Sequence, residues 1–383
     1  MTPSLTLGVE EEYLLVDPVT RDLVNDPSPD FMTECKERLG ERVTPEFLRC
    51  QVEIGTPVCA NIAEARHHLI ALRATIINTA EKHGMKLIAA STHPFAQWDR
   101  QKHTAAARYD GLDADMGGTI RRMLICGMHV HAGVEDEDER IDLMNQVRYF
   151  LPHLLALSTS SPFWGGHDMA MRCTRLGVFD SMPRTGVPDR YENWSEYQRM
   201  VNRLVKAGAI EDATKIWWDM RPSARFPTLE MRITDVCTRL EDGLCIAAFY
   251  QSLLRMLAQL RRRNMRWRIY PRIMLEENRW RAQRYGITKS LIDLGRGESL
   301  PFGALIEELI EIVSEDAASL GCLKEVEHAR VILKRGASSC RQLDVYKRAV
   351  EAGASAKEAL EAVVDFLIVE TAADVPGAGP SSA

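Results

Sequence analysis

The sequence contains no Cys-x-x-Cys pair, although it has nine cysteines among its 383 residues. The thiols are scattered singly along the chain, at positions 35, 50, 59, 126, 173, 237, 245, 322 and 340. An odd number of scattered cysteines in a long chain does not suit a disulfide framework. We therefore expect a protein of a reducing compartment, the cytoplasm.

Long apolar runs and an excess of one charge are missing as well. No stretch of about 18 apolar residues occurs, and the N-terminal residues lack an apolar core behind basic residues, so we expect neither a membrane span nor a signal peptide. The net charge is only -6, with both signs interspersed. This balance predicts neither a nucleic-acid partner nor a membrane partner. The basic run Arg261–Arg268 favours a solvated helix end.

The order of the predicted elements indicates an α+β fold. Apolar and alternating runs predict strands at 5–16, 47–54, 86–91, 124–134, 215–220 and 228–236. Helical periodicity predicts helices at 61–83, 142–160, 195–207, 241–263, 272–285, 303–318, 322–334, 339–352 and 355–370. We find no repeat and no clear linker, and therefore expect a single domain over residues 1–371. The Ala/Gly/Pro/Ser-rich residues 372–383 read as a flexible tail.

One predicted loop is unusually long. Residues 165–193 are rich in glycine and proline and carry four arginines, at positions 172, 175, 184 and 190. Loops of this length in a compact domain are functional or disordered. The arginines suit an anionic ligand about as well as they suit simple solubility. We take the segment as a candidate lid.

Acidic residues occur inside predicted strands, where they need a partner. In GVEEEY, Glu10 and Glu12 point to one side of the strand and Glu11 points to the other. In QVEIGTP, Glu53 lies within an apolar strand, and Glu46 precedes it by seven residues. A buried glutamate is rarely unpaired. A cation near these carboxylates would explain them, although a solvated strand end explains GVEEEY too.

Imidazoles and guanidiniums follow the same spacing. His129 and His131 share one side of the strand CGMHVHAGV, and Glu230 and Arg232 share one side of TLEMRITD. RPSARFP adds Arg221 and Arg225 just before the latter strand. Each feature alone is more often structural than functional. Together they offer oxygen-rich ligands for Mg²⁺ or Mn²⁺ and planar donors for phosphate or carboxylate.

A divalent metal beside arginines is the chemistry of phosphoryl transfer from ATP. The sequence has no GxxxxGK[ST] motif and no kinase HRD and DFG set, so it is neither a P-loop protein nor a protein kinase.

In their order along the chain, GVEEEY, QVEIGTP, CGMHVHAGV and TLEMRITD resemble the carboxylate–amine ligases related to glutamate–cysteine ligase type 2, within the glutamine synthetase superfamily. The resemblance extends over residues 5–367. It includes SSPFWGG, SMPRTGVP, ENRWRAQRYG and RGASSCRQ. It implies a curved, mainly antiparallel sheet with helices on its outer face and a helical C-terminal part.

The resemblance also implies a reaction. ATP would phosphorylate a carboxylate, most simply the γ-carboxylate of glutamate, and an amine such as cysteine would attack the acyl phosphate. It does not identify the amine, and it leaves the oligomeric state, including a homo-oligomer, open. Residue by residue it implies one metal site (Glu10, His129, Glu230), a neighbouring metal site (Glu12, Glu46, Glu53), a nucleotide contact (His131) and phosphate or carboxylate clamps (Arg221, Arg225, Arg232).

Two other interpretations remain open at this point. An HxH pair also marks metal-dependent hydrolases on a TIM barrel, in which Zn²⁺ activates water. A non-catalytic binding protein on the ligase fold is the other alternative.

Overall fold

A computed structural model describes residues 3–104 and 116–378 of the protein. Its centre is a seven-stranded sheet in the order β10–β11–β5–β1–β3–β2, with β4 also paired to β1. All of these pairs are antiparallel. The strands of a TIM barrel are all parallel, so the interpretation as a TIM-barrel hydrolase is wrong. The strands are β1 (Leu7–Val16), β2 (Val43–Pro45), β3 (Gln51–Gly55), β4 (Lys86–Ile88), β5 (Met128–Gly133), β10 (Met220–Pro222) and β11 (Thr228–Met231).

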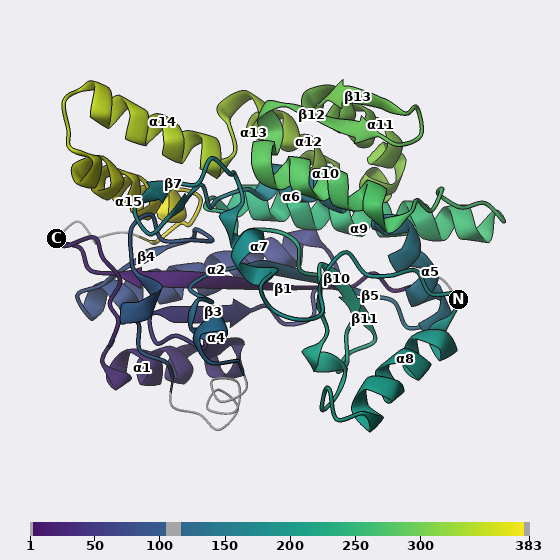
Figure 1. Ribbon diagram of the computed structural model, residues 1–383, viewed down its shortest axis with the longest axis horizontal. Helices are drawn as coiled ribbons and strands as arrows, with labels where there is room; N and C mark the ends of the chain where they lie inside the picture. Colours follow the sequence, from purple (N-terminus) through teal and green to yellow (C-terminus); the bar gives the residue numbers. More distant parts are fainter. Residues whose placement is uncertain (1–2, 105–115, 379–383) are drawn as a thin grey trace.

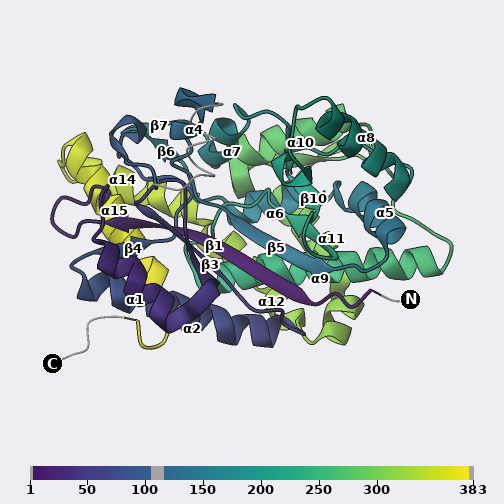
Figure 2. The ribbon, with the colours of Figure 1, turned by 90° about the horizontal axis from the view of Figure 1, so that it is seen from below.

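Helices cover one face of the sheet. Side chains at 7, 9, 11 and 13 of β1 are buried, whereas those at 8, 10 and 12 are only partly buried. The long helices α2 (Ile62–Lys82) and α9 (Leu240–Arg262) pack against β1 and β5 respectively. Figure 2 shows β1 between α2 on one side and α7 (Thr174–Phe179) on the other. The two faces therefore differ: one belongs to the core, and the other carries Glu10 and Glu12.

By length and composition α9 could cross a membrane, but 83% of its apolar stretch is buried inside the protein, as in a core helix. At the start of α2 the Asn61 side chain caps the helix, because it accepts a hydrogen bond from the Glu64 amide, at 3.0 Å.

The core face holds one buried ion pair. Arg73 of α2 donates to both oxygens of Glu11, at 2.8 and 2.9 Å, and both side chains are 0% exposed. Removing one partner of such a pair leaves an uncompensated buried charge. We expect Glu11→Gln to lower the free energy of unfolding by about 3–5 kcal/mol in urea titrations followed by circular dichroism. Glu351→Gln, in an exposed pair with Lys347, is the matched control and should leave stability unchanged. Equal stabilities of the two variants would contradict this prediction.

The C-terminal third is helical, as predicted, and lies above the sheet in Figure 1. It comprises α10 (Arg272–Tyr285), α11 (Phe302–Leu320), α12 (Leu323–Glu327), α13 (Ala329–Arg335), α14 (Ser338–Glu351) and α15 (Ala356–Ala372), with the hairpin β12 (Ser290–Asp293) and β13 (Glu298–Pro301). The chain is still packed where a flexible tail was expected, because Asp374 pairs with Arg239 and Val375 is buried. Residues 379–383 of that tail lie outside the described residues.

The RGASSCRQ segment connects this helical part to residues 159–160. The Ser339 amide donates to the Thr159 carbonyl at 2.9 Å, and Gln342 Nε2 donates to the Ser160 carbonyl at 2.8 Å. These contacts give the motif a structural role.

Several elements differ from the predicted ones. The helix expected at 142–160 is divided into α5 (Glu137–Val147) and α6 (Leu151–Ser158), because Pro152 has no amide to continue a hydrogen-bond ladder and starts a new helix instead. Sequence patterns missed α1 (Pro29–Leu39) and the short α4 (Gly118–Arg121). Helix α8 (Trp194–Lys206) matches the prediction to within one residue at each end.

The predicted loop at 165–193 has structure of its own. It contains the whole of α7 and the short strands β7 (His167–Asp168), paired with β6 (Phe163–Trp164), and β8 (Thr185–Gly186), paired with β9 (Trp217–Trp218). Four residues of α7 are buried, namely Thr174, Arg175, Leu176 and Val178. The middle of this segment therefore belongs to the core and cannot move as a lid without breaking it.

Candidate active site

The strand register brings the acidic and imidazole side chains into one row. Glu230 of β11 lies opposite His131 of β5, and His129 lies opposite Glu10 of β1. On the other side of β1, Glu12 lies opposite Glu53 of β3. Directly opposed residues of antiparallel strands point to the same face and approach closely. Four strands thus deliver one continuous polar stripe across the sheet.

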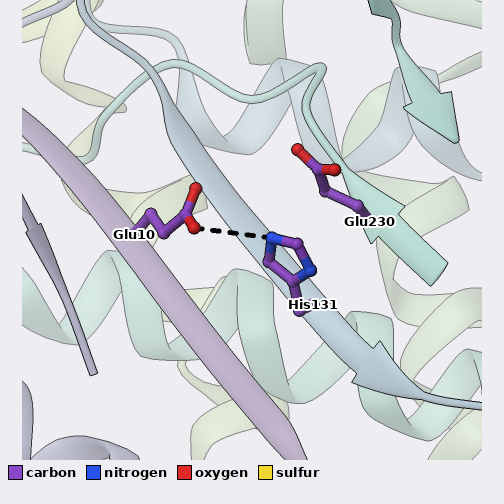
Figure 3. A group of neighbouring side chains, drawn as sticks. All are labelled: Glu10, His131 and Glu230. Atoms are coloured by element: carbon purple, nitrogen blue, oxygen red, sulfur yellow. Dashed lines mark ion pairs between the residues drawn. The ribbon is translucent and has the colours of Figure 1, made fainter. Parts of the chain in front are cut away.

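The first end of the stripe is a group of three potential metal ligands. Donor atoms of Glu10, His131 and Glu230 all lie within 4.8 Å of one another. Figure 3 shows them converging from β1, β5 and β11, with His131 Nε2 at 3.6 Å from a Glu10 oxygen. The other ring nitrogen, Nδ1, lies 2.9 Å from Thr228 Oγ1. That contact orients the ring so that Nε2 faces the carboxylates.

The second group consists of three carboxylates. Oxygens of Glu12, Glu46 and Glu53 also lie within 4.8 Å of one another. Burial, followed by the charge of Glu53, raises the pKa of Glu12 to about 7. Burial and the two neighbouring carboxylates raise the pKa of Glu46 well above its usual value, and burial followed by the Glu10 charge raises the pKa of Glu53.

The main chain and one hydroxyl orient these carboxylates. The Gly127 amide donates to Glu12 at 2.7 Å, the Phe47 amide donates to Glu46 at 3.1 Å, and Thr44 Oγ1 donates to Glu53 at 3.1 Å. Carboxylates held this close together repel one another unless a cation or protons neutralise them. An all-oxygen set of this kind fits Mg²⁺ or Mn²⁺.

His129 lies between the two groups. Its Nδ1 is 3.1 Å from Glu10, and its Nε2 is 3.9 Å from Glu12. Burial, followed by the charge of Arg232, lowers the pKa of His129 to about 4, so the ring is neutral at physiological pH. Among the described residues, its buried Nε2 has no hydrogen-bond partner. A buried polar atom without a partner is costly, and a cation between the groups would satisfy it.

Two of the three predicted arginines hold Glu230. Arg221 donates to both of its oxygens, at 2.8 and 3.2 Å, and Arg232 Nη1 donates to one of them. Burial raises the pKa of Glu230, but the two guanidiniums outweigh it and keep that pKa far below its usual value. Arg221 also donates through Nη1 to the carbonyls of Thr214 and Ile216, so that four of its five N–H groups have partners. Arg232 Nε is buried and, within the described ranges, has no partner.

Arg225 does not join this cluster. It is exposed, and it lines a cavity of about 580 Å³ between α8 and the loop at 223–227. Aromatic and charged side chains line this cavity, among them Trp194, Tyr197, Phe226, Arg140 and Glu135. The Phe226 ring lies 6.4 Å from the His131 ring, edge to face. The cavity therefore adjoins the His131 end of the polar stripe.

Sequence comparison decides the family. The profile of glutamate–cysteine ligase family 2 (GCS2) matches residues 6–365. The chain belongs to this family. A protein of Rhodospirillum rubrum named "Putative glutamate--cysteine ligase 2" is 56% identical over 375 residues, covering 97% of this chain and 96% of that protein. A relative of the same name from Jannaschia sp. is 52% identical over 370 residues, covering 97% of each chain. This family-2 member is thus a carbon–nitrogen ligase.

Solved structures share the fold. A bifunctional glutathione synthetase from Pasteurella multocida has a TM-score of 0.70 at 14% identity, covering 96% of this chain and 52% of its own. A glutamate–cysteine ligase from Francisella tularensis, solved in complex with AMP, has a TM-score of 0.66 at 14% identity, covering 97% of this chain and 93% of its own. These matches agree with the expected glutamine synthetase-like α+β fold.

The structure of this family-2 ligase rearranges the expected ligand sets. His131, rather than His129, completes the group with Glu10 and Glu230, and His129 lies between the two groups. Sequence reasoning missed Thr228 and Gly127. Thr228 had a usable signal, because it lies two residues before Glu230 on the same face of the strand. Gly127 had none, because its contact with Glu12 depends on strand pairing.

Stability of the metal-free ligase should depend on pH. A carboxyl whose pKa is raised on folding contributes stability below its unfolded pKa and loses it as pH rises through its folded pKa. For Glu12 that loss falls between the ordinary value of 4.5 and about 7. Mn²⁺ bound by these carboxylates would replace the lost protons, so we expect the gain in melting temperature that Mn²⁺ gives to grow from about pH 6 to about pH 8. Thermal scans with and without Mn²⁺ test this, with Glu53→Gln as the variant that should gain least. A gain independent of pH would contradict the prediction.

Proposed function

We propose that this protein is an ATP-dependent carboxylate–amine ligase that phosphorylates the γ-carboxylate of glutamate and passes the acyl group to an amine. The single observation that carries the proposal is the polar stripe, in which two oxygen-rich ligand groups flank His129 and adjoin the paired arginines. ATP and an amino-acid carboxylate both carry negative charge, and this site offers cation ligands and guanidiniums to bind it.

The residues of the site have different roles in the proposed reaction. Glu10, His131 and Glu230 would hold one divalent ion, and Glu12, Glu46 and Glu53 would hold another, with His129 between them. Bound Mg²⁺ or Mn²⁺ would neutralise the charge that builds up on the transferring phosphoryl group. Arg221 keeps Glu230 ionised and oriented. Arg232 shares Glu230 with Arg221, and its unpaired Nε is available to an oxygen of the phosphoryl group or of the carboxylate.

We place the adenosine of ATP in the cavity beside His131. Phe226 and Trp194 offer flat apolar surfaces for a base, and Arg225 offers a cation at the same cavity. His131 then lies between the nucleotide and the first ligand group, which preserves its expected nucleotide contact.

The acyl phosphate is the intermediate of this reaction. The glutamate γ-carboxylate attacks the γ-phosphorus of ATP and ADP leaves. The amine nitrogen then attacks the acyl carbon, so that phosphate leaves, an amide forms and the amine gives up a proton. Water would destroy this intermediate, so the reacting atoms must be shielded from solvent. The burial of His129 and Glu230 on the floor of the site supports such shielding.

Phosphate release tests the proposal. Purified protein is incubated with ATP and Mg²⁺, with and without glutamate, and then with a panel of amines that includes cysteine. Release that depends on glutamate and rises with one amine supports the ligase and identifies its acceptor. No release with glutamate and any of the amines would refute the proposed glutamate-dependent reaction. Titration calorimetry with Mg²⁺–ATP and with Zn²⁺ tests binding directly.

A further inference from the structure

Arg175 is a buried cation beside the polar stripe. It belongs to α7, is 3% exposed, and points toward the main chain that carries Arg232. We propose that Arg175 is a positioning residue of the ligase site, which fixes the main chain at Arg232 and the amide that holds Glu12. The inference rests on the proposed function for its kinetic consequences, but not for its effect on metal binding.

Both the amide and the carbonyl of Arg232 form hydrogen bonds. Its amide donates to the Asp219 carbonyl at 2.8 Å, and its carbonyl accepts from Arg175 Nη2 at 3.2 Å. The next carbonyl, that of Ile233, accepts from Arg175 Nη1 at 3.4 Å. Strand β11 ends at Met231, and the Arg175 guanidinium binds the two carbonyls that follow it. Without Arg175 both buried carbonyls lose a donor, and the Arg232 side chain loses its fixed base.

The same guanidinium fills the space beside Gly127. A Cβ at position 127 would lie 2.3 Å from Arg175 Nη2 and 2.9 Å from its Cζ, so only glycine allows this approach. The Gly127 amide in turn donates to Glu12, at 2.7 Å. Arg175 therefore supports two residues of the site through two separate stretches of main chain.

Arg175 is itself well anchored. Its amide donates to Ser161 Oγ at 3.2 Å, and the same hydroxyl donates to the buried carboxylate of Asp235 at 2.7 Å. Asp235 also accepts from the Ser160 amide at 2.8 Å and attracts Arg175 electrostatically. These contacts give the SSPFWGG motif a role: it ties α7 to the end of β11.

The test compares Arg175→Ala with Arg148→Ala in the full-length protein. Arg148 is the matched control, because it is 2% exposed, donates to the carbonyls of Asn145 and Pro188, and touches no residue of the site. Mn²⁺ affinity is measured from the spin-resonance signal of unbound Mn²⁺. Hydrogen exchange of the peptide at 229–236 and the kcat for phosphate release are measured in parallel.

We expect Arg175→Ala to weaken Mn²⁺ binding by about tenfold or more, to speed exchange at 229–236 and to lower kcat by about a hundredfold. Guanidinium ion should restore part of both losses. Arg148→Ala should lower the melting temperature about as much as Arg175→Ala does. It should keep Mn²⁺ affinity and kcat within about twofold of wild type. Wild-type Mn²⁺ affinity in folded Arg175→Ala, or equal losses in Arg148→Ala, would overturn the proposal.

Gly127→Ala provides a second route if Arg175→Ala fails to fold. Its methyl group should displace the Arg175 guanidinium and weaken Mn²⁺ binding. The double variant Gly127→Ala/Arg175→Lys should then bind Mn²⁺ no more weakly than the single variant Arg175→Lys. Full additivity of the two substitutions would overturn the proposal. An inactive wild-type protein would refute the proposed function and would leave the Mn²⁺ comparison to decide the role of Arg175.

Discussion

Replacing Glu53 by glutamine should strongly lower turnover without harming the fold. Glutamine keeps the size of the side chain and its contact with Thr44, but it removes one charge from the group with Glu12 and Glu46. Neutral amide oxygens are weaker ligands for Mg²⁺ than carboxylates, so we expect kcat/KM for ATP to fall on the order of 10²- to 10³-fold. Phosphate release in the presence of glutamate measures this loss.

Metal-free stability distinguishes this prediction from a general defect. Because Glu53→Gln removes repulsion among buried carboxylates, the metal-free variant should be at least as stable as the metal-free wild type at neutral pH. Glu298→Gln, on the separate hairpin β12–β13, is the matched control and should keep wild-type activity. An active Glu53→Gln with intact circular dichroism would remove the second ligand group from the site.

Two-residue spacing was enough to find most of the stripe. Glu10 with Glu12, and His129 with His131, had to share a face once their segments were strands, and the family resemblance placed these strands in one sheet. The spacing could not show which residues face each other across strands. Glu230 meets His131 rather than His129, because β11 pairs with β5 in a register that only the folded sheet sets.

Other misses share one physical cause, which is competition from contacts distant in sequence. The strand predicted at 228–236 ends at Met231, and beyond it the carbonyls of Arg232 and Ile233 accept hydrogen bonds from the Arg175 side chain. The clamp predicted at Arg221 stays a prediction, but Glu230 and two carbonyls already use four of its five N–H groups. Such contacts produce no periodic pattern of residues in the sequence. The burial of α2 and α9 does produce one, because apolar residues recur at helical spacing.

The arginines of the site should therefore differ in importance. Arg232 lies on the floor of the site with an unpaired Nε, whereas Arg225 is exposed at the adjoining cavity. We expect Arg232→Ala to lower kcat on the order of 10²- to 10³-fold, because in the proposed reaction its guanidinium lies where charge develops on the phosphoryl group. Arg225→Ala should instead raise the KM for ATP several-fold and leave kcat nearly unchanged.

Arg232→Lys separates the effect of the charge at position 232 from the effect of the guanidinium geometry. A lysine keeps the charge but cannot donate from two sides of a planar group, so it should restore only a small part of kcat. Loss of Arg232 leaves Glu230 paired with Arg221 alone, and the protein should stay folded because Arg221 still donates to both carboxylate oxygens. Arg203→Ala, on the exposed side of α8, should match the wild type in both kcat and KM. Wild-type kcat in a folded Arg232→Ala would show that charge on the phosphoryl group is balanced elsewhere, and the clamp would then have to be sought at Arg225.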